Sequence, residues 1–587
     1  MTYSKQNIAS DLQQGVGCLQ QNNLAIAAAC FNRILAHAPK HPDALHLLGL
    51  VYARRNEHVD ALKLIKRAVK LQPKDSRFHR SLGLVQAERG KDKEALASLR
   101  KAVLLSPKDS GLHNDLGLFL SQRGRTVEAI AEYRKAVQCD SKNIMALSNL
   151  ANDLLQTEQV DESCKCYETA VALDEGYFDA QYGLAQALAL KPDAELAVAQ
   201  YRKVLLMQPE HKQANNKLGS LLKNLGDLDG AVELISKAVS IDPEYAGAHN
   251  NLGNALRKQG HIEESFACYQ RALEIDPQYA DAHWNRSLGE LLLGRFDSGW
   301  VGYEWRWQCD AFVARRRAFK QPQWDGSRLG GKTILLHAEQ GNGDSIQFIR
   351  YVSVVAALGG KVVVECQRSL KSLFATVAGI DVLVAAGDPL PRFDVHSAFL
   401  SLPGILGTDL SSIPADIPYL TAEAAAALPS VDAEVLKVGI VWAGSPTHVN
   451  DHNRSVALNR FVPLGDSNVQ LYSLQVGAAA ADLDCLAGGK QILNAVAGVE
   501  DYAETAAIIQ QLDLVVSVDT SVAHLAGALG KPVWILLPFM PDWRWMLERD
   551  DSPWYPSMRL FRQQQGGWDQ VFADLSKALS ELSVNRI

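Results

Sequence analysis

The chain has 587 residues, a formal net charge of −7 at pH 7, 47% hydrophobic residues and 21% charged residues. This composition excludes a chain that is disordered throughout, and the mild acidity gives no reason to expect nucleic acid as a partner. No apolar run approaches the ~18–20 residues that span a bilayer. The N-terminus lacks a basic segment followed by an apolar one, and the nine cysteines form no C-x-x-C pair. We therefore expect a reduced, cytoplasmic protein with no membrane span and no secretory leader.

A repeat of 34 residues runs through the first half of the chain. Prolines recur at this interval or at a multiple of it: Pro39, Pro73, Pro107, Pro209, Pro243 and Pro277. Glycines and alanines keep the same spacing in two further columns: Gly15, Gly49, Gly83, Gly117, Gly219 and Gly253, and Ala68, Ala102, Ala136, Ala170, Ala238 and Ala272. Small residues let two helices pack closely, and a proline ends the second helix. One helix pair cannot bury its own apolar face, so we expect the pairs to stack into a solenoid.

Between the two helices of each pair stand glycines that we expect to adopt a positive φ at the end of the first helix: Gly90, Gly124, Gly226, Gly260 and Gly294. The columns L-G, A-x3-F/Y and a closing proline resemble the tetratricopeptide family. Such a solenoid has a concave groove, and asparagines recur on the first helices: Asn114, Asn216 and Asn250 in one column, Asn149, Asn251 and Asn285 in the next. These side chains either hydrogen-bond an extended peptide or form a solvated polar face. Histidines on the first helices are expected to be surface or packing residues: His46, His79, His113, His249 and His283.

Short apolar runs replace the repeat after residue 310. Buried strands are expected at residues 333–338, 361–366 and 381–384, with helices at 344–358 and 369–378 between them. A second series of strands is expected at residues 438–442, 470–474, 491–495, 514–518 and 533–537. Strands that alternate with helices form parallel sheets, and ligands bind at the carboxyl ends of such strands. We expect four parts: a repeat solenoid (1–311), a linker (312–332) and two Rossmann-like halves (333–428 and 429–587).

The loop after the first of these strands contains Gln340, Gly341, Gly343 and Asp344. Glycines let the backbone approach a ligand, and the N-terminus of the following helix favours negative charge nearby. Asp344 has two possible roles: it caps the helix together with Gln347, or it is a catalytic carboxylate. This segment matches neither the Walker loop nor the G-x-G-x-x-G fingerprint.

The loop after the strand 438–442 contains Ser445, Thr447, Asn450 and Arg454, and Gln475 follows the strand 470–474. Hydroxyl groups can donate to phosphate, and an arginine can bind phosphate with two hydrogen bonds. These residues are therefore candidates for binding a nucleotide sugar, and an ordinary surface loop is the alternative. His448 and His452 have the spacing of zinc ligands on a helix, but the Asn, Asp and Ser content argues against a helix, so we expect no metal site here.

Residues 519–524 join a buried strand to a helix that is expected to begin near Thr520 or Ser521. The hydroxyls of Thr520 and Ser521, with the first N–H groups of that helix, would bind phosphate, and Asp519 would accept a sugar hydroxyl. The alternative is an ordinary strand–helix turn. His524 faces either the ligand or the core. An aromatic segment at 541–545 either covers a base or sugar or packs internally.

Residues from about 300 to 578 resemble the glycosyltransferase-like domain that follows bacterial tetratricopeptide arrays. That domain is similar to the heptosyltransferases of glycosyltransferase family 9, which have the GT-B fold. The matching residues are Gly343-Asp344 and Asp519-Thr520-Ser521, with His524 and Gly530-Lys531-Pro532. The resemblance implies Asp344 as the base and residues 519–524 as the nucleotide-diphosphate site. Ser521 stands where the family has glycine.

The expected fold class is thus an all-α tetratricopeptide superhelix followed by an α/β, GT-B-like pair of Rossmann-type domains. The resemblance implies a glycosyltransferase that moves a sugar from a nucleotide-sugar donor to an acceptor hydroxyl. The reaction would be inverting and would need no metal and no cofactor besides the co-substrate, and the acceptor would be a protein or peptide in the repeat groove. Two alternatives stay open: a non-catalytic scaffold with a degenerate pocket, and a nucleotide-sugar epimerase. Epimerase chemistry needs a second acid or a lysine beside Asp344, and Glu339 is the nearby candidate.

Overall fold

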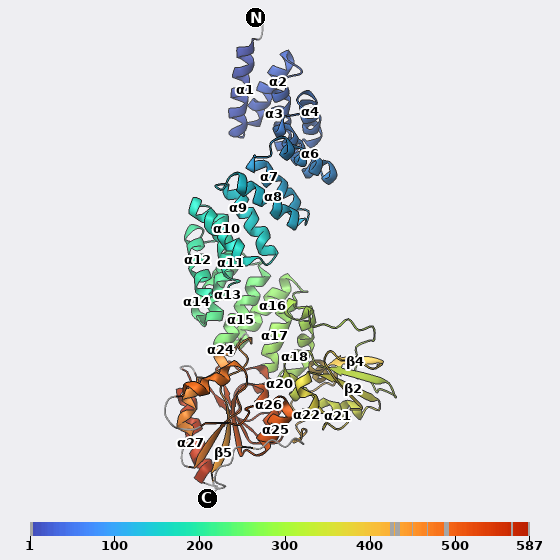
Figure 1. Cartoon of the computed structure of the whole chain (residues 1–587), viewed down its shortest axis with the longest axis vertical. Helices are drawn as coiled ribbons and strands as arrows, with labels where there is room; N and C mark the ends of the chain where they lie inside the picture. Colours follow the sequence, from blue (N-terminus) through green and yellow to red (C-terminus); the bar gives the residue numbers. More distant parts are fainter. Residues whose placement is uncertain are drawn as a thin grey trace. The chain divides into compact units, whose positions relative to one another are not determined.

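The computed structural model of the chain describes residues 4–422, 428, 435–448, 450–465, 468–486, 492–564 and 567–584. The chain divides into two compact units, Met1–Ile241 and Asp242–Ile587. Among the described residues, helices occupy the first three hundred positions and strands follow them (Figure 1). The expected fold class, helical repeats followed by an α/β part with parallel sheets, is confirmed. The four parts that the sequence suggests are a finer division, and their three boundaries stay a prediction.

Unit 1 is a series of helix pairs: α1 (Lys5–Gln20), α2 (Leu24–His37), α3 (Pro42–Arg54), α4 (His58–Leu71), α5 (Ser76–Glu88), α6 (Asp92–Leu105), α7 (Ser110–Ser121), α8 (Thr126–Cys139), α9 (Ile144–Gln156), α10 (Val160–Leu173), α11 (Phe178–Leu188), α12 (Ala194–Met207), α13 (Lys212–Leu225) and α14 (Leu228–Ile241). Close packing explains the glycine column. A β-carbon at Gly49 would lie 2.6 Å from Ile65 of the partner helix, and one at Gly117 would lie 2.6 Å from Tyr133. The glycines between the helices have the expected positive φ, from +68° at Gly90 to +92° at Gly260.

Four of the five repeat histidines have a shared structural role. Each places its Nε2 against the carbonyl oxygen of the proline six residues earlier: His79 on Pro73, His113 on Pro107, His249 on Pro243 and His283 on Pro277, at 2.9 to 3.1 Å. A carbonyl only accepts, so Nε2 carries the proton in each case. His46 departs from this pattern, and its Nε2 lies 2.8 Å from the Ser81 hydroxyl. These histidines therefore tie consecutive repeats together, which agrees with the expected packing role.

Unit 2 begins with further helix pairs: α15 (Ala246–Gln259), α16 (Ile262–Ile275), α17 (Ala280–Leu292), α18 (Phe296–Tyr303) and the short helices η1 (Glu304–Gln308) and α19 (Asp310–Val313). The last pair packs on the α/β part of the same unit. The Trp300 indole donates to the carbonyl of Thr408 at 2.8 Å, and a β-carbon at Gly404 would lie 3.1 Å from Trp300. The last helices of the repeat array therefore pack directly on the α/β part and form one side of unit 2.

The first sheet is parallel, with the order β3-β2-β1-β4. Its strands are β1 (Thr333–His337), β2 (Lys361–Cys366), β3 (Val382–Ala385) and β4 (Val395–Ala398), with helices α20 (Asn342–Phe348), α21 (Tyr351–Ala356) and α22 (Lys371–Phe374). The expected single helix over 344–358 begins two residues earlier and is interrupted before Tyr351. The buried Arg350 stands at this break and donates to the carbonyls of Gln347 and Trp554. The strand β4 was not predicted, because His396 and Ser397 break up its short apolar run.

The second sheet is also parallel, with the order β10-β9-β8-β5-β6-β7. Its strands are β5 (Leu436–Val441), β6 (Val469–Ser473), β7 (Leu493–Asn494), β8 (Leu514–Val518), β9 (Val533–Leu537) and β10 (Met558–Arg562). The helices α25 (Tyr502–Gln510), α26 (Ser521–Ala528) and α27 (Asp569–Val584) accompany them. The expected strand at 491–495 shortens to two residues, and its first residue, Gln491, lies outside the described residues. The strand β10 was not predicted.

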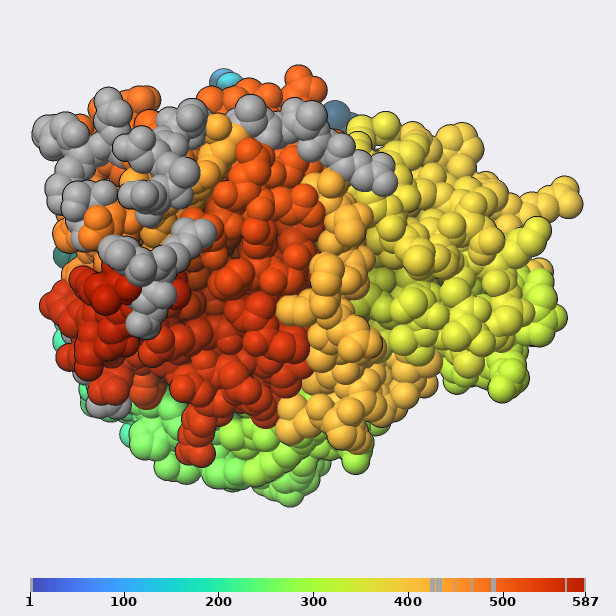
Figure 2. All heavy atoms as spheres, turned by 90° about the horizontal axis from the view of Figure 1, so that it is seen from below, coloured from blue at the N-terminus to red at the C-terminus, as the bar shows by residue number. Residues whose placement is uncertain are grey.

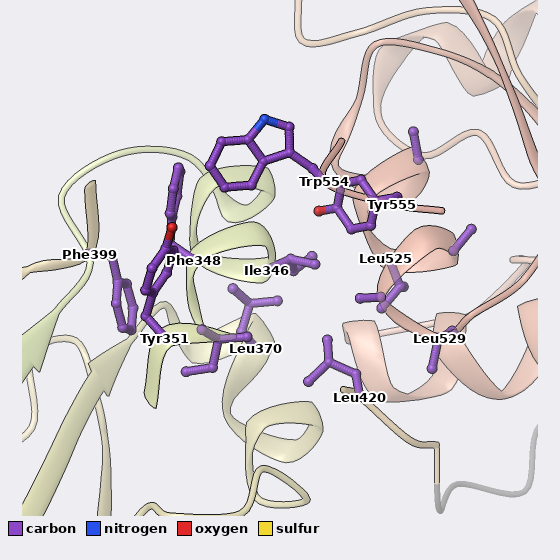
Figure 3. Packing of buried hydrophobic residues seen from close by; sticks show 14 of the residues in the cluster. Ile346, Phe348, Tyr351, Leu370, Phe399, Leu420, Leu525, Leu529, Trp554 and Tyr555 are labelled. Atoms are coloured by element: carbon purple, nitrogen blue, oxygen red, sulfur yellow. The ribbon is translucent and has the colours of Figure 1, made fainter. Parts of the chain in front are cut away.

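The two sheets share one apolar core within unit 2. Figure 3 shows Ile346 and Phe348 of α20 in the same buried cluster as Leu525 of α26 and Tyr555. The segment before the second sheet bridges both parts, since the N–H of Tyr419 donates to the carbonyl of Ala528 at 3.0 Å. On the face drawn in Figure 2, the gold surface around residues 400–420 lies between the yellow first-sheet residues and the red second-sheet residues. This shared core fixes the loops of the two sheets relative to each other.

Candidate functional site

Asp344 lies in the first turn of α20, two residues after the helix begins. One carboxylate oxygen, Oδ2, accepts from the N–H of Gly341 at 2.8 Å, where the chain enters the helix. The other oxygen, Oδ1, accepts from the Arg544 guanidinium at 2.5 Å. The expected capping role is thus present, but with Asp344 inside the first turn rather than at its start. The helix uses only one oxygen, and the side chain is 20% exposed.

Gly343 brings the first half against the start of α26 in the second half. A β-carbon at this position would lie 3.1 Å from His524 Cδ2 and 3.3 Å from Ser521 Cα. A polar chain crosses the same boundary: Asn342 donates to the Tyr502 hydroxyl at 3.3 Å, and that hydroxyl lies 2.7 Å from Ser521 Oγ. The two segments that carry the family resemblance, 175 residues or more apart in the sequence, therefore meet in space.

Gln340 connects this loop to the last repeat. Its side-chain amide donates to the Tyr303 hydroxyl at 3.1 Å, and its backbone carbonyl accepts from Gln367 at 2.9 Å. Next to it, the fully buried Arg306 donates to Glu339 at 2.9 Å. Burial raises the pKa of Glu339 to about 7, although the Arg306 charge opposes this shift. Glu339 is therefore committed to an ion pair with the repeat array, and its second oxygen has no hydrogen-bond partner among the described residues.

Four candidate residues lie at or just before the start of α26: Asp519, Thr520, Ser521 and His524. Thr520 precedes the helix in an extended conformation without capping it through its side chain, and its hydroxyl lies 3.1 Å from Ser517 Oγ. Ser521 is the first helical residue, and its hydroxyl is shared with Tyr502 as described above. The N–H groups of this first turn thus receive no side-chain cap from Thr520, which leaves the turn suited to an anion.

His524 faces the interior rather than an open surface. Its Nδ1 lies 3.0 Å from the Tyr555 hydroxyl, and its ring stacks on Trp545 with centroids 5.4 Å apart. Burial lowers the pKa of His524 well below its ordinary value, so the ring is neutral. Its Nε2 lies 3.9 Å from Asp519 Oδ1. Burial, with the nearby charge of Asp542, raises the pKa of Asp519 to about 6.

Arg454 lies beside Asp519. Its Nη1 donates to the Asp519 carbonyl at 3.0 Å, and its Nε donates to Asp451 at 3.1 Å. The guanidinium covers Gly444, where a β-carbon would lie 2.3 Å from Nη2. A single helical turn, α24 (Asp451–Arg454), holds it there, although the composition of this loop argued against a helix. The structure thus places Arg454 next to the start of α26.

The remaining candidates of this loop have other surroundings. Ser445 and Thr447 are exposed, and their hydroxyls lie 2.8 Å apart. Asn450 accepts from the side chain of Asn453 at 2.7 Å. Gln475 accepts from the N–H groups of Trp442 and Ala443 and donates to the carbonyls of Ala443 and Val476, so its amide fixes the ends of β5 and β6. We place Gln475 as a support of the loop that carries Ser445.

Sequence reasoning missed Arg544, which the structure puts at the centre of the site. This arginine is buried, and besides Asp344 it donates to Gln347 at 2.5 Å and to Asp542 at 2.8 Å. Its guanidinium lies over the Trp543 ring at 4.4 Å, and Trp543 in turn packs edge-on against Trp300. The available signal was an arginine between two tryptophans in a segment that reads as an aromatic cluster.

The charges at the site are mixed. Asp344, Asp519, Asp542 and Asp451 lie around two arginines, Arg454 and Arg544. The described part of the chain contains no group of three or more histidine, cysteine or acidic side chains placed to hold a metal ion. The site therefore combines four carboxylates and two arginines around the first turn of α26.

Two kinds of known family match this chain: one matches the repeat helices and the other matches the α/β part. The tetratricopeptide repeat family matches residues 12–76, 60–110, 82–144 and 148–205, and a second tetratricopeptide family description matches 219–260 and 253–288. Glycosyltransferase family 9 (heptosyltransferase) matches residues 465–536, which include β8 and α26. The expected tetratricopeptide array and family 9 likeness are thus confirmed, the latter over a short region.

Among curated proteins, the chain is similar to Protein FlbA of Caulobacter vibrioides, with 26% identity over 336 residues. The match covers 50% of this chain and 54% of that protein, so the chain spans about half the length of this relative. Among solved structures, YrrB, a tetratricopeptide protein with an unusual peptide-binding site, is 23% identical over 31% of this chain and 95% of its own, with a TM-score of 0.29. Pseudomonas aeruginosa pilF is 22% identical over 35% and 94%, with a TM-score of 0.32.

Every helix among the described residues is too short or too polar to cross a lipid bilayer.

Proposed function

We propose, from tetratricopeptide repeats joined to a region similar to glycosyltransferase family 9, that the protein transfers a sugar from a nucleotide-sugar donor to an acceptor hydroxyl. One observation carries the proposal: Gly343 of the first half lies directly against the start of α26 in the second half, and the next residue, Asp344, pairs with Arg544 of the second half. A transferase needs a base and a diphosphate site within one sugar of each other, and this contact supports such an arrangement.

The proposed reaction divides the work between the two halves. Asp344 takes the proton of the acceptor hydroxyl, and the oxygen attacks the anomeric carbon of the donor, which inverts its configuration. The nucleoside diphosphate leaves with the bonding electrons. The N-terminus of α26 and the Arg454 guanidinium stabilise its charge, so the reaction needs no metal. Asp519 accepts a hydroxyl of the bound donor.

The acceptor is proposed to be a protein or peptide in the groove of the repeats. Asparagine pairs of consecutive first helices support this: Asn149 donates to Asn114 at 3.0 Å in unit 1, and Asn285 donates to Asn250 at 3.0 Å in unit 2. Asn114 and Asn250 are buried and hold the partly exposed Asn149 and Asn285 in place, so a peptide backbone can use the remaining donor and acceptor groups of these two amides. We place this activity in the cytoplasm.

Of the two alternatives, the scaffold has one observation in its favour, because both oxygens of Asp344 already have partners. The epimerase is less well supported, since Glu339, the second acid it would need, is paired with Arg306.

A thermal-shift screen of UDP, GDP, ADP and CMP sugars on the purified protein tests the proposal. We expect one nucleotide class to raise the melting temperature by several degrees, because ligands that bind the native state stabilise it. No stabilisation by any of the four classes would contradict the transferase and favour the scaffold.

A further inference from the structure

The Arg544 guanidinium joins the two halves of the proposed site. Its three bonds use separate nitrogens: Nη2 reaches Asp344, Nε reaches Gln347 and Nη1 reaches Asp542. The first two partners belong to α20, and the third lies on the arginine's own loop. The Arg544 side chain is 9% exposed and that of Asp344 is 20% exposed, so water screens this ion pair weakly. The pair therefore holds the proposed base firmly.

Arg544 also lies at the edge of the proposed diphosphate site. Its neighbour Trp545 stacks on His524 of α26, and Gly343, the neighbour of Asp344, contacts Ser521 at the start of that helix. The ion pair is thus bracketed on both sides by residues that touch the first turns of α26. A diphosphate bound to that turn would come near the guanidinium.

Both arginines near the proposed diphosphate site already have hydrogen-bond acceptors. Arg544 serves two carboxylates, Asp344 and Asp542, while Arg454 is held by Asp451 and by the Asp519 carbonyl. If these side chains kept their positions, an incoming diphosphate would meet carboxylates that already pair with both arginines. A phosphate group carries more charge than a carboxylate, and it accepts two parallel hydrogen bonds from one guanidinium. The incoming diphosphate is therefore the stronger partner for Arg544.

We propose that Arg544 is shared between Asp344 and the donor diphosphate, an inference that rests on the proposed transferase function. Without a donor, one oxygen of Asp344 accepts from Arg544 and the other from the Gly341 N–H, so neither oxygen is without a partner for the acceptor hydroxyl. When the diphosphate binds, the guanidinium turns to the phosphate oxygens and releases Asp344, which can then take the acceptor proton. The base becomes available only while the donor is in place.

Four forms of the full-length chain test this exchange: wild type, Asp344→Asn, Arg544→Gln and the double variant, each titrated with inorganic pyrophosphate by calorimetry. Asparagine keeps the acceptor for the Gly341 N–H but loses the charge that holds Arg544. We therefore expect Asp344→Asn to bind pyrophosphate about tenfold more tightly and Arg544→Gln about tenfold less tightly. The double variant should match Arg544→Gln, because the gain needs the arginine.

The outcomes are distinct. If Asp344→Asn gains the same affinity with Gln at position 544, the gain comes from the field of the carboxylate, and the sharing is overturned. If wild type binds pyrophosphate and Arg544→Gln binds it equally, the sharing is overturned while the donor site stands. If wild type binds neither pyrophosphate nor UDP, GDP or ADP, the donor site fails, and the proposed function fails with it.

Two further variants complete the experiment: one replaces Arg544→Gln if that variant misfolds, and the other is a matched control. Arg544→Lys replaces Arg544→Gln in the cycle if the latter does not give a native circular dichroism spectrum. Lysine keeps the charge but cannot make the two parallel bonds, so its affinity for pyrophosphate should also fall. Arg549→Gln is the matched control, since Arg549 lies five residues further along and pairs with Asp551. Its pyrophosphate affinity should equal that of wild type.

Discussion

Gly343 lies so close to Ser521 that a β-carbon on the glycine would stand 3.3 Å from the Cα atom of the serine. The two residues lie in α20 and α26, helices that follow strands of different sheets of unit 2, and their contact sets the distance between Asp344 and the start of α26. The polar bridge through Tyr502 runs alongside this contact. The glycine is therefore part of the site geometry, although no side chain of its own can bind a ligand.

Gly343→Ala tests this contact. The added methyl group must push the backbone of α26 away by a few tenths of an ångström, which should cost about 1 kcal/mol of stability and weaken nucleotide binding. The melting temperature and the nucleotide dissociation constant measure the two effects. Gly17→Ala is the control, because Gly17 lies in helix α1 with open space around it. Unchanged nucleotide binding by Gly343→Ala would mean that this approach does not shape the site.

The hydroxyls at the start of α26 give a second prediction. Thr520→Ala with Ser521→Ala should weaken nucleotide binding by about 1–3 kcal/mol, because two donors to phosphate are lost. Calorimetry with the nucleotide from the thermal-shift screen measures the change. Tyr502→Phe separates a direct role from an indirect one, since it removes only the hydroxyl that Ser521 shares. Full affinity of the double variant would show that the phosphate does not sit at this turn.

Glu339 should make stability depend on pH. Its pKa is raised to about 7 in the folded protein, so folding favours the protonated form. This contribution is fully present below the ordinary pKa of a glutamate, near 4.5, and is lost as the pH rises towards 7. Glu339→Gln cannot titrate, so the stability difference between wild type and this variant should shift against wild type by about 1–3 kcal/mol between pH 5 and pH 8.

Melting curves across this pH range measure the shift. Glu233→Gln, at an exposed glutamate of α14, should follow wild type at every pH. A constant difference between wild type and Glu339→Gln would mean that Arg306 keeps Glu339 ionised throughout.

The groove proposal predicts a separation of functions between the two units. Removing residues 1–241, which form unit 1, should leave nucleotide binding intact, because every residue of the site lies in unit 2. Transfer to a protein acceptor should fall strongly, since most of the repeats are gone. Transfer assays with the truncated and the full chain measure this, and equal activity would contradict a groove that presents the acceptor.

The repeats could be predicted from the sequence because their contacts are local. Gly49 and Ile65 lie 16 residues apart, and each repeat forms a similar helix pair. The strand β4 escaped prediction because His396 and Ser397 occupy two of its four positions, and its pairing with β1 is a contact across about sixty residues. Local periodicity carries no information on such pairing.

The site was predictable only in part for the same reason. Asp344 and the segment 519–524 stood out because each follows a buried strand, and parallel sheets bring such ends together. Arg544 did not stand out, since its partners Asp344 and Gln347 lie about 200 residues away and its neighbours are tryptophans. Only the packing of the two halves shows that this arginine faces the proposed base.

The central claim is that Asp344 is the base of a sugar transfer whose donor binds at α26. The most direct measurement is sugar transfer by Asp344→Asn, with the donor identified by thermal shift, together with donor binding by the same variant. We predict a loss of transfer of about 10²–10⁴-fold with donor binding retained, because a general base is removed and the donor site is left in place. Transfer at the wild-type rate by Asp344→Asn would contradict this account.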